Sequence, residues 1–139
     1  MMKKIVALLF FALCLLPSAF CQIKINKATS QKIIAGMGGV SMKYVIEYAE
    51  KKTGSTQIDS VKSIADNSTM SFYTNKKEAN IELIFNIALQ PPPKCRTCVE
   101  TTPPQPNLTK GVIIYYKSAD KKLKRKVKKF APLEDVMMP

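Results

Sequence analysis

The chain has 139 residues, of which 22 are Lys or Arg and 10 are Asp or Glu, so its formal net charge is +12. A hydrophobic content of 46% is ordinary for a globular protein and excludes both wholesale disorder and a multi-span membrane protein. Histidine is absent, which excludes a Ser-His-Asp triad, a histidine general acid or base, and a histidine-ligated zinc site.

The first 21 residues have the pattern of a signal peptide. Lys3 and Lys4 make the start of the chain positive, and residues 5–16 form an uncharged apolar run. These 12 residues are fewer than the roughly 20 that a transmembrane helix needs. The sequence therefore predicts a cleaved leader and a mature chain without a transmembrane segment.

The small residues before position 22 indicate where the leader is cut. Ala19 and Cys21 fit the two positions at which small side chains enter the peptidase, so we expect residues 22–139 to be the mature, secreted or periplasmic chain. Lipidation of Cys21 is the alternative, but Phe20 stands where lipoprotein processing requires a small residue. Cleavage removes two of the positive charges and leaves a net charge of +10.

Alternating apolar residues dominate the mature chain, a pattern typical of half-buried strands. It is clearest in residues 42–49, 80–89 and 112–116. In the last of these segments, Ile113 and Tyr115 alternate with the predicted inward residues and fall on the opposite face. The predicted inward side chains are Met42, Tyr44, Ile46 and Tyr48; Ile81, Leu83, Phe85, Ile87 and Leu89; and Val112, Ile114 and Tyr116.

Weaker patterns bring the expected total to about seven strands. They occupy residues 31–35, 57–64, 69–73 and 123–130. Ile58, Val61 and Ile64 have helical spacing, so the second of these segments could instead be one short helix.

Short strands separated by turns, within about 118 residues, predict one antiparallel β-sandwich domain, with an immunoglobulin-like sandwich as the leading fold. The antibody hallmarks are missing, because the chain has no Trp and its cysteines are too close in sequence to bridge two sheets. Residues 90–110 form a long Pro- and Cys-rich loop, and long ordered loops often carry function.

Cys95 and Cys98 in that loop form a Cys-x-x-Cys pair. In an exported protein a structural disulfide is the expected state. A redox pair would need a helix N-terminus at its first cysteine, which the prolines on either side of the pair cannot supply. Zinc would need two more ligands. Redox or metal chemistry of this pair is nevertheless kept as the alternative.

Copper is the metal that this composition could hold, because thiolate and thioether ligands select Cu(I). The candidate thioethers are Met37, Met42, Met70, Met137 and Met138. Met42 and Met70 alternate with core residues, and no Met-x-x-Met cluster is present. We therefore expect no cofactor and no metal site.

A basic run near the end of the chain is the other notable feature. It carries seven positive charges, on Lys121, Lys122, Lys124, Arg125, Lys126, Lys128 and Lys129. One interpretation is a solvated edge strand whose lysines prevent edge-to-edge pairing. The other is a surface for an anionic partner, such as lipid headgroups, an acidic glycan or an acidic protein. Nucleic acid is not expected, because the protein is exported and no aromatic residues are interleaved with the run.

The Lys-Lys leader followed by Gln22, the Lys/Ile/Asn-rich body, the segment from Val127 to Leu133 and the final Pro139 resemble small secreted proteins of Bacteroidetes-type bacteria. This resemblance implies export and a β-sandwich, and names no active residue. The Cys-containing proline-rich loop departs from that group.

The sequence predicts an exported, non-enzymatic binding or interaction module, whose contact surface is the basic run, the 90–110 loop or both. The alternative is a thiol/disulfide redox or copper-handling protein that uses Cys95 and Cys98.

Overall fold

The structure is a computed structural model of the chain, and it describes residues 23–36, 39–50, 56–90 and 105–139. Within these residues the chain forms strands and no helix. The strands are β1 (Lys24–Ala35), β2 (Val40–Ala49), β3 (Thr56–Ser63), β4 (Thr69–Met70), β5 (Tyr73–Lys76), β6 (Ile81–Gln90), β7 (Val112–Ser118), β8 (Lys121–Val127), β9 (Ala131–Pro132) and β10 (Val136–Met138).

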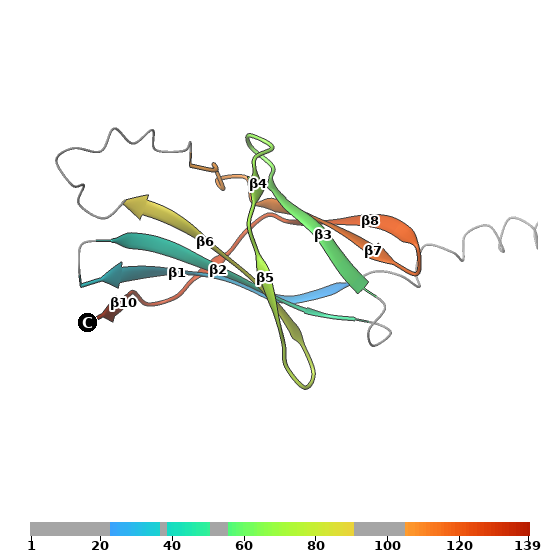
Figure 1. Cartoon of the computed structure of the whole chain (residues 1–139), viewed down its shortest axis with the longest axis horizontal. Coiled ribbons are helices and arrows are strands. Elements are labelled where there is room, and N and C mark those ends of the chain that lie inside the picture. Colours follow the sequence, from blue (N-terminus) through green and yellow to red (C-terminus); the bar gives the residue numbers. More distant parts are fainter. Residues whose placement is uncertain (1–22, 37–38, 51–55, 91–104) are drawn as a thin grey trace, which may run out of the picture.

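The strands form two sheets that face each other (Figure 1). The larger sheet has the order β10-β1-β2-β6-β5, with β9 also paired to β1, and the smaller sheet has the order β4-β3-β7-β8. All neighbours are antiparallel except β9 and β10, which run parallel to β1. The first eight strands thus follow the immunoglobulin arrangement of ABED against C′CFG. The prediction of an antiparallel, immunoglobulin-like β-sandwich is confirmed.

Most of the core between the sheets comes from the three segments with the clearest alternation. Ile46 of β2, Leu83 and Phe85 of β6, and Val112 and Ile114 of β7 are fully buried. Leu89 was expected to share this face but is 40% exposed, because the register of β2 against β6 shifts there and leaves Leu89 as the extra residue of a β-bulge. Met42, Tyr44 and Ile81, also expected to point inward, are half-buried.

Most of the weaker segments needed correction. β1 is 12 residues long and begins at Lys24, well before the expected residue 31. The strand expected at 57–64 is confirmed as β3, which ends at Ser63, and its pairing along β7 excludes the alternative of a short helix. The single strand expected at 69–73 is two short strands in different sheets, β4 beside β3 and β5 beside β6.

The expected strand at 123–130 is shifted: β8 begins at Lys121 and ends at Val127. It ends early because Phe130 packs its ring against those of Tyr44 and Phe85, with centroids 5.0 and 6.2 Å away. This contact draws the chain from the smaller sheet to the edge of the larger one, where β9 and β10 pair with β1.

Gly111, which precedes β7, lies very close to the backbone at the end of β8. Gly111 has a φ of +87°, its N–H donates to the Leu108 carbonyl at 2.9 Å, and its carbonyl accepts from the Ile64 N–H at 3.0 Å. A Cβ at this position would lie 2.0 Å from the carbonyl oxygen of Val127. The close approach of the two backbones therefore requires glycine.

We expect Gly111→Ala to lower the free energy of unfolding by more than about 2 kcal/mol, since it adds both a strained φ and a backbone clash. Gly39→Ala is the matched control, because its Cβ would meet only the Ala35 Cβ, at 3.9 Å. Denaturant unfolding of both variants measures the difference. An equal loss of stability in the two would show that the Gly111 contact is not needed.

Asp66 ties the β3–β4 turn to the segment that leads into β7. Its carboxylate accepts the hydroxyl and N–H of Ser68 at 2.6 and 3.1 Å, and the N–H of Asn107 at 2.9 Å. The Ser68 hydroxyl, followed by the backbone N–H groups, holds the pKa of the Asp66 carboxyl well below its ordinary value.

This lowered pKa predicts an acid-sensitive contribution to stability. The ionised carboxylate stabilises the native state above the ordinary aspartate pKa of about 4, and this contribution is lost as the pH falls from there toward the lower native pKa. We expect Asp66→Asn to be less stable at pH 7 and to lose less stability on acidification than the parent. Denaturant unfolding across the acid range, with the exposed Asp135→Asn as control, measures both. An unchanged acid dependence in Asp66→Asn would contradict the prediction.

Candidate functional site

The basic run lies at one edge of the smaller sheet. β8 pairs with β7 and, among the described residues, with no strand on its other side. All seven basic residues predicted to bind an anionic partner are exposed: Lys121, Lys122, Lys124, Arg125, Lys126, Lys128 and Lys129. Lys128 and Lys129 follow the strand, while the other five lie within it.

The register of β3, β7 and β8 shows which side chains share the outer face of the smaller sheet. Val112, Ile114 and Tyr116 of β7 point into the core, so their neighbours along the strand point outward. Three rows of side chains result across β3, β7 and β8. They are Lys62, Ile113 and Lys126; Ser60, Tyr115 and Lys124; and Gln57, Lys117 and Lys122.

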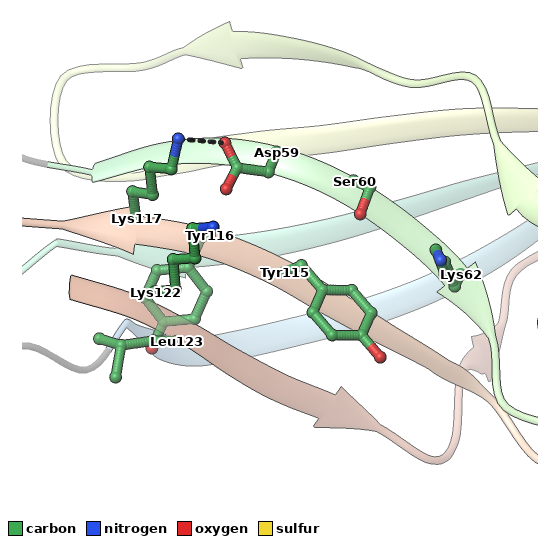
Figure 2. Close-up of a pocket in the computed structure, with 8 residues that line it drawn as sticks. All are labelled: Asp59, Ser60, Lys62, Tyr115, Tyr116, Lys117, Lys122 and Leu123. Atoms are coloured by element: carbon green, nitrogen blue, oxygen red, sulfur yellow. Dashed lines mark ion pairs between the residues drawn. The ribbon is translucent and has the colours of Figure 1, made fainter. Parts of the chain in front are cut away.

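A shallow pocket of about 260 Å³ lies on this face, over β3, β7 and β8. Figure 2 shows Tyr115 over β7, with Ser60 and Lys62 on the neighbouring strand β3. The Lys62 ammonium lies 5.8 Å from the centroid of the Tyr115 ring, within the range of a cation–π contact. The pocket is smaller than the roughly 300–1,000 Å³ of most small-molecule sites. It suits one small group of a larger partner.

A β-bulge brings one acidic side chain to the pocket. The register of β3 against β7 shifts between Ile58 and Ser60 and leaves Asp59 as the extra residue. Its carboxylate lies 3.9 Å from the Lys117 ammonium, at the far limit of an ion pair, as the dashed line in Figure 2 marks. Among the described residues that line the pocket, Asp59 is the one carboxylate.

The outer face therefore has a clear excess of positive charge. Five lysines stand on it, from β3, β7 and β8, against Asp59 at the bulge. The five are Lys62, Lys117, Lys122, Lys124 and Lys126. Their combined field attracts anions, and their ammonium groups offer hydrogen-bond donors without acceptors.

Only part of this face could be predicted from the sequence. The lysines of β8 were recognised because they are consecutive in the chain, whereas Lys62, Lys117 and Tyr115 were missed as site residues. The signal for Tyr115 was present, since it falls on the face opposite the core residues in the predicted strand at 112–116. Its lysine neighbours could not be found without knowing that β7 lies between β3 and β8.

The described methionines among the other candidates lie away from this face. Cys95, Cys98 and Met37 lie outside the described residues. Met70 is buried in the core, and Met137 and Met138 are exposed on β10 at the opposite sheet.

Within residues 23–36, 39–50, 56–90 and 105–139, no three Cys, Asp or Glu side chains gather where they could hold a metal ion. The same described segments contain no helix long and apolar enough to cross a membrane.

A second hollow, of about 340 Å³, lies at one end of the sandwich and is lined partly by core side chains. Tyr48 and Glu50 belong to it. Burial, with a smaller effect of the Glu50 charge, raises the pKa of Tyr48 to about 12. The phenol therefore stays protonated at neutral pH and does not act there as a base.

No protein-family model matches the chain, and neither a curated protein nor a solved structure matches it significantly. The candidate site therefore rests on the geometry and charge of the smaller sheet.

Proposed function

We propose that the protein is an exported, non-enzymatic binding module that holds an anionic partner on the outer face of its smaller sheet. One observation carries the proposal: among the described residues, three adjacent strands align five lysines on this face, three of which line a pocket whose one carboxylate is that of Asp59. A sheet built on a buried core presents these charges at set positions, so the partner meets a formed surface.

The chemistry of the face suits binding rather than catalysis. The side chains at the pocket are lysines, a serine, an aspartate, tyrosines and a leucine. The chain has no histidine to activate the Ser60 hydroxyl. Lysines around a shallow pocket instead attract anions at long range and hold them by several weak, salt-sensitive contacts.

The edge-strand interpretation explains less of the structure. Lysines on β8 would protect an open sheet edge, but Lys117 stands on β7, which is paired on both sides. Lys62 stands on β3, which is also paired on both sides, by β4 and β7. Neither lysine guards an edge, whereas both extend the cationic surface across the sheet.

The proposal gives no redox or copper role to Cys95 and Cys98. Both lie outside the described residues, and no observation on the described part of the chain favours such a role.

We expect the variant Lys122→Gln, Lys124→Gln, Lys126→Gln to bind anionic probes at least about tenfold more weakly than the parent at low salt. Each exposed contact contributes about 0.5 kcal/mol, and three together correspond to that factor. The probes are dextran sulfate, linear polyphosphate and phosphatidylglycerol vesicles, titrated at about 20 mM and about 300 mM salt.

The control carries the same change in charge on the larger sheet: Lys24→Gln, Lys27→Gln, Lys76→Gln, at three exposed positions. It should bind like the parent. If the parent bound none of the three probes at low salt, or if both variants lost affinity equally, the proposed anion-binding face would be wrong.

Export is tested by the intact mass of the protein recovered outside the cytoplasm. We expect the chain to begin at Gln22, with a mass two hydrogens below that of the reduced form because Cys95 and Cys98 are joined. An added acyl mass on Cys21 would contradict simple cleavage, and a retained leader would contradict export by this route.

A further inference from the structure

We infer that the anionic partner is an acidic polysaccharide, one of whose sugar rings packs on Tyr115 at the pocket of β3, β7 and β8. This inference rests on the proposed function and names the class of ligand that the same face takes. Beside the lysines, the pocket holds the ring of Tyr115, the carboxylate of Asp59 and the hydroxyl of Ser60.

An aromatic ring lies at the centre of the cationic surface. Tyr115 occupies the middle row of the face, between Ser60 and Lys124. The C–H groups on one side of a pyranose ring form an apolar surface that packs on the electron-rich face of an aromatic ring. A bare inorganic anion gains nothing from such a ring, whereas an acidic sugar uses both the ring and the surrounding lysines.

The pocket also holds a carboxylate. Asp59 would repel a ligand that offers only anionic oxygens. It favours a ligand that also carries hydroxyl groups, because a carboxylate accepts hydrogen bonds from them and the Ser60 hydroxyl can donate or accept. Both residues line the pocket together with Lys62, Lys117 and Lys122. The combination of acceptors, cations and a ring matches a hydroxylated, acidic ligand.

A polysaccharide and a membrane require different kinds of surface. Binding to a lipid surface draws on buried apolar area in addition to charge. Among the described residues, the large exposed hydrophobic side chains are on other parts of the molecule: Tyr73, Leu89, Leu133, Met137 and Met138. On the outer face, the hydrophobic side chains of Ile113 and Tyr115 are only half-exposed and lie between lysines. The face therefore lacks the apolar side chains that would insert into a bilayer.

The experiment compares acidic sugars with an anion that has no sugar ring, on the mature full-length protein at low salt. The probes are polygalacturonate and dextran sulfate, with neutral dextran and linear polyphosphate alongside. We expect Tyr115→Ala to weaken binding of at least one acidic polysaccharide by about fivefold or more, equivalent to about 1 kcal/mol. Its affinity for polyphosphate should stay within twofold of the parent, and Tyr115→Phe should retain the polysaccharide affinity.

Tyr73→Ala is the matched control, because Tyr73 is a tyrosine on β5 of the larger sheet and is 52% exposed. It should leave binding of every probe unchanged. Thermal unfolding of each variant confirms the fold. If Tyr115→Ala does not fold, Tyr115→Val takes its place, since valine keeps strand propensity without a ring.

The outcomes distinguish the inference from the proposed function. If the parent binds these anions but Tyr115→Ala changes neither polysaccharide, or weakens polyphosphate equally, the polysaccharide inference is wrong and the anion-binding face stands. If phosphatidylglycerol vesicles bind more tightly than both acidic polysaccharides, the partner is a membrane and the inference is again wrong. If the parent binds none of the anions, the proposed function fails.

Discussion

The structure depends on the burial of one face of β7. Val112 and Ile114 are fully buried and Tyr116 is 1% exposed, so this strand cannot rotate or slip by one residue without moving its whole apolar set into water. The same constraint orients the other face of the strand. Tyr115 and Lys117 are held outward because their neighbours are held inward, and the paired strands β3 and β8 add their lysines in register. The core thus determines the geometry of the candidate site.

Most of the fold could be predicted from local patterns, because strand alternation depends on neighbours two residues apart. The segments around Ile46, Phe85 and Ile114 were predicted as strands with the correct inward face, and an all-β sandwich followed from them. The strand predictions fail where contacts between residues far apart in the sequence determine the structure. The single strand expected at 69–73 is divided between the two sheets, and the strand through Arg125 ends early because Phe130 packs on the opposite sheet. Local propensity carries no information about either contact.

The candidate site was predictable only in its contiguous part. The lysines of β8 stand within a few residues of one another, whereas Lys62, Tyr115 and Lys124 come from three strands and meet only through sheet order and register. The bulge that brings Asp59 to Lys117 is a further departure from regular pairing. Alternation indicated that Tyr115 points outward. It could not indicate that lysines would surround it.

The arrangement of like charges argues that the face is more than a solvated surface. Lys117 and Lys122 are directly opposed on neighbouring antiparallel strands, a pairing that destabilises a sheet by a few tenths of a kcal/mol. Lys62 and Lys126 flank Ile113 in another row. Protection of an open edge needs charge only on β8, so it gives no reason for lysines on the paired strands β3 and β7. An anion bound among them, as proposed, would offset the repulsion, so its binding would stabilise the sheet.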